Sequence, residues 1–190
     1  ALPKYPFSIT NGSPTQTVIF PNHDLKVNDE VLFFNGASNN PIESFNLNTN
    51  FFPLFHILAS NLSATATTVT LDGTTLCAST GFFFIQSATT PATGVADYVP
   101  VIQREVIQYG AKSGAQNLTS LTRGTNALFR GEVSTSTTAT AHSSGVNVFP
   151  SLKIQTITTR TENTGAMPAT KTVNTGFTVT LPYNAVGTIT

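Results

Sequence analysis

The chain has 190 residues, of which 39% are hydrophobic and 9% are charged, and nine basic residues balance nine acidic ones to a formal net charge of +0. This length is enough to bury a sizeable core, and 14 Phe residues are present to fill it. The charges form no basic patch and no run approaches roughly 20 apolar residues, which argues against nucleic acid and a membrane as partners.

Short runs rich in Val, Ile, Thr and Phe follow one another between turn residues, and such runs predict β-strands. The N-terminal part begins with two prolines in residues 2–7, which suit an extended arm. Strands are predicted at 17–20 and 31–34. A further apolar run, 51–58, contains Pro53, which favours a sheet edge or a bulge.

The central part, residues 61–150, follows a small, polar join at 60–65 and predicts a β-meander. Its expected strands are 68–71, 81–85, 105–109, 118–125 and 141–149. A Gly- and Ser-containing loop is expected before Leu118. The segments 87–94 and 134–140 are rich in Ser and Thr and predict exposed loops.

The C-terminal part, residues 151–190, predicts strands at 152–158 and 177–181, separated by a loop at 162–168. In the first of these strands Ile157 breaks the alternation, which leaves the register ambiguous. The last residues, 185–190, form a strand-like tail that could pair with a sheet edge.

The chain therefore divides into an N-terminal arm with a small β segment (1–60), the central module (61–150) and a C-terminal β segment with its tail (151–190). No amphipathic helix of ten residues is visible. The expected fold is all-β, an antiparallel β-sandwich or a barrel-like meander.

The residues with reactive side chains form no recognisable site. His23, His56 and His142 lie far apart without metal-ligand spacing, so we expect structural or surface roles for them. No Gly-x-Ser-x-Gly elbow is present, and residues 123–125 lack the spacing and the lysine of a phosphate-binding loop. The single cysteine, Cys77, has no disulfide partner, and we expect a buried, unreactive thiol. We therefore predict no catalytic, cofactor-binding or metal-binding residues and no cofactor.

Glu105 and Arg123 are charges in predicted strands or strand ends with apolar neighbours. They could form an ion pair in a binding site or a cross-strand pair that fixes the register. We favour the structural interpretation, because a lone ion pair does not make a catalyst.

Three central segments, 105–109 (EVIQY), 118–125 (LTSLTRGT) and 141–148 (AHSSGVNV), resemble a β module of tailed-bacteriophage virion proteins. The pattern of that module is E-I-I-x-Y-t, then L-t-x-x-x-R-G, then A-H-x-x-G-x-x-V, and residues 69–85 fit its preceding strand and apolar run. The chain departs from the module by a long insertion between Gly124 and Ala141.

Residues 23–31 are similar to a second pattern from phage tails, H-x-L-x-x-G-D-x-V, with Asn28 in place of the glycine. Together the two resemblances cover about half of the chain. They imply a virion structural role, in a phage particle assembled in the host cytoplasm, without placing the protein on the particle.

A neutral, Thr-rich β body whose ends can add strands to neighbouring subunits suits a capsid cement or decoration protein. The expected partners are the major capsid protein or tail subunits, together with copies of the chain in a symmetric homo-oligomer such as a trimer. A tail, baseplate or fibre module is the alternative that the resemblance supports equally.

Two further hypotheses come from other classes of protein. A carbohydrate-binding β-sandwich would use exposed aromatic residues such as Tyr109 or Tyr183 to stack on sugars. A β-type glycosidase would use distant carboxylates such as Asp97 or Glu105.

Overall fold

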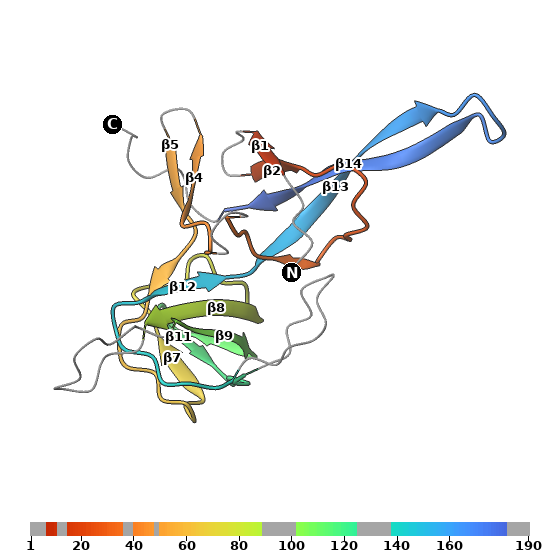
Figure 1. Cartoon of the computed structure of the whole chain (residues 1–190). Coiled ribbons are helices and arrows are strands. Elements are labelled where there is room, and N and C mark those ends of the chain that lie inside the picture. Colours follow the sequence, from red (N-terminus) through yellow and green to blue (C-terminus); the bar gives the residue numbers. More distant parts are fainter. Residues whose placement is uncertain are drawn as a thin grey trace. The chain divides into compact units, whose positions relative to one another are not determined.

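A computed structural model of the chain describes residues 7–10, 15–35, 40–47, 50–88, 102–124 and 138–181. These residues form antiparallel β-strands and contain no helix, as the sequence predicts (Figure 1). None of the described segments is thus a helix long and apolar enough to cross a membrane. They fall into two compact units. Unit 1 takes the residues of Phe55–Ser151, and unit 2 combines the segments before and after it.

Unit 1 contains two antiparallel sheets. One has the order β6 (His56–Ile57), β12 (Asn147–Pro150), β8 (Gly81–Ala88) and β9 (Ile102–Tyr109). The other has the order β10 (Ala111–Ser113), β11 (Asn117–Thr119) and β7 (Thr68–Thr70). The order is not that of a simple meander, because β12 lies between β6 and β8 and β11 lies between β10 and β7.

The core of unit 1 lies on one face of β8 and β9. Phe83 pairs with Ile107 and Ile85 pairs with Glu105, so the odd-numbered residues of both strands share a face. With Tyr109 of β9 and Val148 of β12, that face packs against residues of the second sheet and of the connections, namely Leu58, Leu62, Val69, Leu71, Cys77 and Leu118. The pairing therefore directs the carboxylate of Glu105 into an apolar core.

Unit 2 contains a five-stranded sheet and a separate pair of strands. The sheet has the order β1 (Ser8–Thr10), β2 (Thr15–Ile19), β14 (Thr170–Thr180), β13 (Leu152–Asn163) and β3 (Glu30–Val31). The pair is β4 (Ser44–Leu47) with β5 (Asn50–Pro53). Pro53 ends a strand of this two-stranded sheet, in agreement with the predicted edge position.

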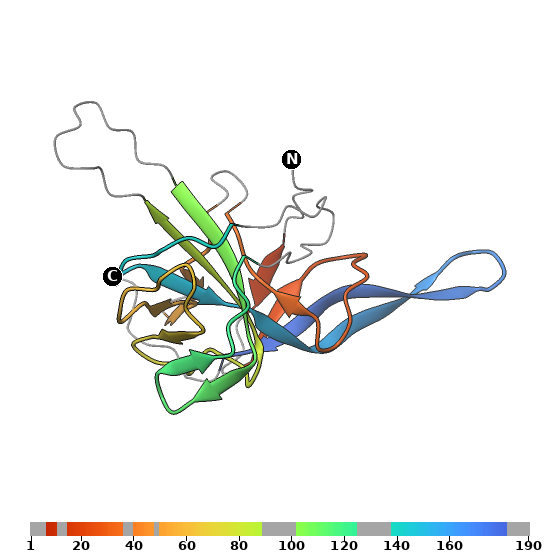
Figure 2. The same ribbon diagram turned by 90° about the horizontal axis from the view of Figure 1, so that it is seen from below.

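The β13–β14 hairpin explains the ambiguous register of residues 152–158. Ile154 pairs with Val179 but Thr156 pairs with Thr178, so Gln155 forms a β-bulge. The bulge reverses the faces of the residues that follow, which is why the position of Ile157 breaks the alternation. Both strands extend much further than the sequence predicts (Figures 1 and 2).

Several other local predictions need correction. The strands expected at 31–34, 118–125 and 141–149 are shorter, because β3 ends at Val31, β11 ends at Thr119 and β12 begins at Asn147. Ser87 is not in an exposed loop but is buried in β8, and residues 111–113 of the expected loop before Leu118 form β10. Glu162 and Asn163 belong to β13, which shortens the predicted 162–168 loop. Ala88 also belongs to β8, while residues 89–94 and 134–137 of the predicted loops, the arm up to residue 6 and the tail at 185–190 lie outside the described residues.

Candidate functional site

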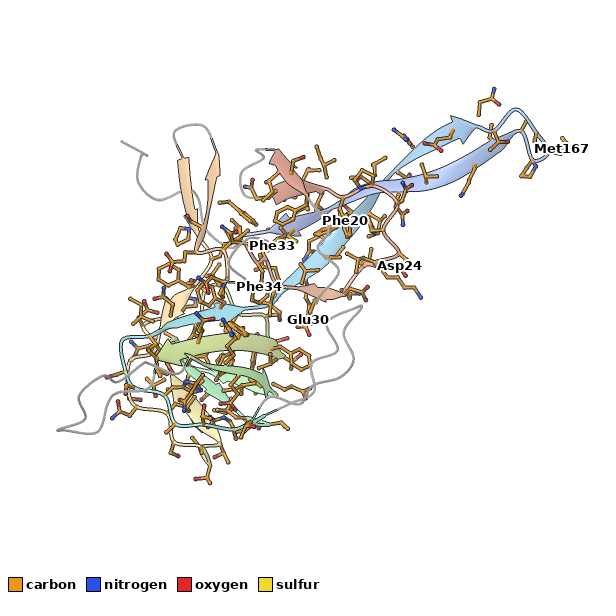
Figure 3. The ribbon with its side chains drawn as sticks, viewed as in Figure 1. Phe20, Asp24, Glu30, Phe33, Phe34 and Met167 are labelled. Atoms are coloured by element: carbon orange, nitrogen blue, oxygen red, sulfur yellow. The ribbon has the colours of Figure 1, made fainter. Side chains whose placement is uncertain are left out.

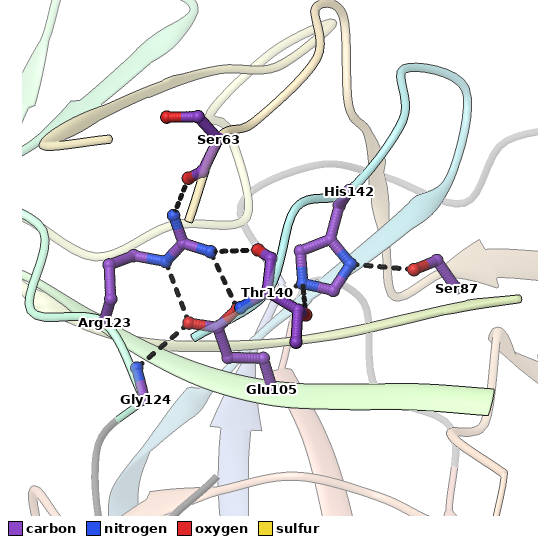
Figure 4. A network of polar contacts seen from close by, with 7 residues as sticks. All are labelled: Ser63, Ser87, Glu105, Arg123, Gly124, Thr140 and His142. Carbon is purple, nitrogen blue, oxygen red and sulfur yellow. Dashed lines mark hydrogen bonds and ion pairs between the residues drawn. The ribbon is translucent and has the colours of Figure 1, made fainter. Parts of the chain in front are cut away.

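The side chain of Glu105 is the centre of a buried polar network in unit 1 (Figure 4). It is 0% exposed and accepts five hydrogen bonds. Arg123 donates from Nε to Oε1 and from Nη2 to Oε2, each at 2.8 Å. The backbone N–H of Gly124 donates to Oε1 at 2.9 Å, and that of Thr140 to Oε2 at 3.2 Å. Nε2 of His142 lies 3.0 Å from Oε2.

Arg123 ties the carboxylate to two other parts of the chain. Its side chain is 8% exposed. Nη1 donates to the carbonyl of Ser63, and Nη2 donates to the carbonyl of Thr140 at 2.7 Å. The next residue, Gly124, has a φ of 60°, a left-handed conformation that glycine adopts without steric cost. Arg123 and Gly124 therefore act together. The turn at Gly124 directs its backbone N–H towards the carboxylate to which Arg123 also donates.

His142 extends the network to β8. Its side chain is 0% exposed, and its Nδ1 lies 2.8 Å from the hydroxyl of Ser87. These contacts fit the tautomer with hydrogen on Nε2, which donates to Glu105 while Nδ1 accepts the Ser87 hydroxyl. The backbone of His142 pairs in both directions with Leu62, at 2.8 and 2.9 Å. The side chain and backbone of His142 thus join its segment to Ser87, Glu105 and Leu62, which are distant in the sequence.

The hydrogen bonds keep Glu105 ionised. Burial raises the pKa of this carboxyl, but the hydrogen bonds from His142, Arg123, Thr140 and Gly124 outweigh it and lower the pKa from 4.5 to about 2. A shift of this size corresponds to ~3 kcal/mol in favour of the folded state at neutral pH.

Ser87, His142 and Glu105 are the residue types of a hydrolase triad, but the geometry favours a structural role. The Ser87 hydroxyl is buried in β8 rather than presented at the surface. Glu105 is neutralised by Arg123, whereas the acid of a triad serves to orient and stabilise the imidazole. The arrangement holds five segments of unit 1 together, from Ser63, β8, β9, residues 123–124 and residues 140–142.

Sequence reasoning found only half of this network. It predicted the Glu105–Arg123 pair, and the structure confirms that pair as a bidentate contact. Ser87 lies in a segment that the sequence predicts to be a loop, and no sequence feature indicates a partner for His142. The signal was present in the resemblance, because the E, R-G and H of the phage pattern fall on Glu105, Arg123 with Gly124, and His142.

The other two histidines also have protein partners at both ring nitrogens. Nδ1 of His56 lies 3.1 Å from Asp72 Oδ1, and its Nε2 accepts from the N–H of Leu76 at 3.1 Å. Burial holds the pKa of His56 below 6.5 against the opposing effect of Asp72. Nε2 of His23 contacts the carbonyl of Gly176 at 2.9 Å, and Nδ1 accepts from Leu25.

These contacts engage both ring nitrogens of each histidine in bonds within the protein. Within the described ranges no three His, Cys, Asp or Glu side chains gather as metal ligands would.

The segment that resembles the second phage pattern forms a turn in unit 2. Asn28 has a φ of 71°, so the residue that replaces the glycine adopts a conformation that Asn tolerates better than most residues. Asp29 accepts from the N–H of Lys26 at 2.8 Å. The N–H of Asn28 donates to the carbonyl of Ile154, whose own N–H donates to Asp29, both at 2.9 Å. The turn therefore fastens residues 23–31 to β13.

Cys77 is buried in the core of unit 1, as predicted. Burial raises the pKa of its thiol to about 12, against a smaller opposing effect of Lys112. The ammonium of Lys112 is occupied nearby, where it donates to the carbonyls of Thr74 at 2.8 Å and Cys77 at 3.0 Å. The thiol is therefore a packing residue.

The carbohydrate hypothesis loses one of its two residues. Tyr109 is 1% exposed and its hydroxyl donates to the carbonyl of Ala78 at 3.3 Å, so its ring faces the core and offers no platform for a sugar. Tyr183 and Asp97 lie outside the described residues.

Comparison with protein-family models, with curated proteins and with solved structures found no match to this chain.

Proposed function

We propose that this protein is a non-enzymatic structural component of a tailed-phage particle, a cement or decoration protein that holds neighbouring capsid subunits. The observation that carries the proposal is the buried network of unit 1. The three charged or titratable residues of the resembled pattern, Glu105, Arg123 and His142, meet there and bind one another. Because these residues bind one another, they stabilise the fold of unit 1. A stable fold is what a protein that holds capsid subunits together requires.

The composition supports the same role. A neutral surface with few charges gives little electrostatic attraction to nucleic acid and suits contacts made by backbone pairing and Thr hydroxyl groups. In this proposal the Pro-containing arm and the strand-like tail add strands to neighbouring subunits. The partners are the major capsid protein and further copies of the chain.

The alternative is a tail, baseplate or fibre module. The turn at Asn28 and Asp29 favours it, because the glycine and aspartate positions of the tail pattern are occupied by residues that form a turn. Asn28 has the left-handed φ of the glycine that it replaces, and His23 is buried with both ring nitrogens bonded.

Immunogold labelling of intact virions with antibodies against the purified protein distinguishes the two. We expect gold particles on the head, at sites related by the symmetry of the capsid. Label confined to the tail would replace the cement role with the tail role, and unlabelled particles that lack the protein by mass spectrometry would reject both. A glycan array with the same protein tests the carbohydrate hypothesis, and we expect no binding.

A further inference from the structure

The distal half of the β13–β14 hairpin is a two-stranded ribbon in unit 2 (Figures 1 and 2). On its outer side, β13 pairs with β3 only at Leu152 and Lys153, and the last backbone hydrogen bonds on that side are at Ile154. Beyond the bulge, residues 158–163 pair only with β14 among the residues that the structure describes. Among the described residues, the other edge of β13 therefore has no partner strand over this stretch.

An open edge on a narrow ribbon is unusual in a stable protein. An isolated two-stranded hairpin is only marginally stable in water, and its unpaired N–H and C=O groups are a template for another strand. Residues 159–161 of the ribbon are exposed, although Val173 on the neighbouring strand is buried, and at the tip Met167 is 94% exposed (Figure 3). One more strand on the β13 edge would pair these groups and widen the sheet.

The charged side chains along this edge of β13 can pair with those of a second copy of the same strand. Arg160 and Glu162 are two residues apart and so lie on the same face, where Nε of Arg160 donates to Oε1 of Glu162 at 2.9 Å. Their side chains are 63% and 40% exposed. If β13 pairs antiparallel with β13 of a second copy about a twofold axis at Thr161, Arg160 of each copy faces Glu162 of the other. A parallel arrangement would place like charges opposite each other.

The neighbouring strand reinforces this register. Within the hairpin, Glu162 pairs with Lys171 and Arg160 pairs with Val173. In the antiparallel pair each Glu162 would therefore lie between its own Lys171 and Arg160 of the second copy. A carboxylate between two cations is the favourable arrangement for cross-strand side chains.

We propose that two copies of this chain associate through the β13 edges of their ribbons, with Thr161 on the twofold axis, to form a continuous four-stranded antiparallel sheet. The occupant of the open edge is thus a second copy. The proposal concerns the isolated protein and does not depend on its place on a particle.

Paired charge reversal tests the register. Arg160→Glu makes both facing positions acidic in a homodimer, and Glu162→Arg makes both basic. We expect each variant alone to dimerise at least about tenfold more weakly than the unmodified chain in sedimentation equilibrium, because two attractive pairs become repulsive. An equimolar mixture of the two variants restores opposite charges at both positions and should dimerise like the unmodified chain.

The equimolar mixture is also a control for folding. If the two variants associate with each other, both must have folded ribbons. Single variants that dimerise normally, a mixture that fails to associate, or an unmodified chain that is monomeric or trimeric would each overturn the proposal.

A disulfide test locates the axis. In the proposed dimer residue 161 faces itself, with Cβ atoms about 5 Å apart, so Thr161→Cys should give an intermolecular disulfide under mild oxidation. Position 159 faces position 163, and the two 159 positions lie about 13 Å apart, so Thr159→Cys should not. Cys77 is buried and does not compete. Equal cross-linking of the two variants would contradict the assigned register.

Discussion

Glu105 and Arg123 lie 18 positions apart and meet through two parallel hydrogen bonds of 2.8 Å, inside a core made of apolar side chains. The carboxylate is on β9, on the face shared with Ile107. A buried charge pair of this kind stabilises a fold only while both partners are present, because either charge alone would be left without compensation. The first predictions follow from this relationship.

Glu105→Gln should lower the free energy of unfolding of unit 1 by about 3–5 kcal/mol, because it leaves the buried guanidinium of Arg123 without its counter-charge. Urea unfolding monitored by the reactivity of Cys77, which lies in the core of unit 1, measures this change. The matched control is Arg104→Gln, which changes an exposed contact with Gln86 in the same unit and should cost less than about 1 kcal/mol. Equal costs for the two variants would contradict the structural role of the network.

Acid should destabilise unit 1 through the same carboxyl. The pKa of Glu105 is about 2 in the folded state and 4.5 in the unfolded state, so the unfolded chain binds the proton first. The contribution of Glu105 is therefore complete above about pH 4.5 and is lost as the pH falls towards 2. Unfolding titrations between pH 6 and 2 should show this loss, and Glu105→Gln should show a smaller one. A variant with an unchanged pH slope would refute the assignment.

Cys77 should react slowly with thiol reagents in the native protein. Burial raises its pKa to about 12, so almost no thiolate is present at pH 8, and the sulfur is enclosed by the core. Labelling with an aromatic disulfide reagent should be at least about a hundredfold slower than in urea-unfolded chain. Rapid labelling of the folded protein would show that this part of the core opens readily.

Gly176→Ala should disrupt the β2–β14 pairing in unit 2. A Cβ atom at this position would lie 2.0 Å from the carbonyl oxygen of Val18, which is backbone and cannot rotate away. We expect a loss of about 2–4 kcal/mol in chemical unfolding followed by circular dichroism. Gly165→Ala is the control, because its φ of 66° adds strain of about 1–2 kcal/mol but its Cβ meets no atom within 4 Å. A smaller cost at 176 than at 165 would contradict the close approach.

Asn28→Gly should preserve or slightly increase stability, whereas Asn28→Ala should cost about 1 kcal/mol. The reason is the φ of 71°, which glycine adopts freely and alanine does not. Thermal unfolding of the three proteins measures the order, with Gly at least as stable as Asn and Ala the least stable. Alanine as stable as glycine would mean that the turn relaxes to another conformation, and the likeness to the glycine of the tail pattern would lose its support.

Local sequence pattern was sufficient for the class of fold and for the location of most strands. Val69, Phe83 and Phe177 lie in short β-branched or aromatic runs, and the preference of such residues for a pleated surface is a local property. The thiol of Cys77 could be placed in a core because nothing near it in the chain would ionise it. The distal ribbon was harder to recognise, because residues 158–163 are mostly polar and have no buried face to impose a period.

The sequence by itself determined that this protein is built from strands, and that Glu105 and Arg123 are unusual charges. Only the tertiary structure decided that Ser87 and His142 join them, because β8, β9 and the 140–142 segment come together through pairings between residues far apart in the chain. The bulge at Gln155 and the open edge of β13 are likewise properties of strand register. The hydrophobic pattern of a strand indicates which of its faces is buried, but it does not identify the distant strand with which it pairs.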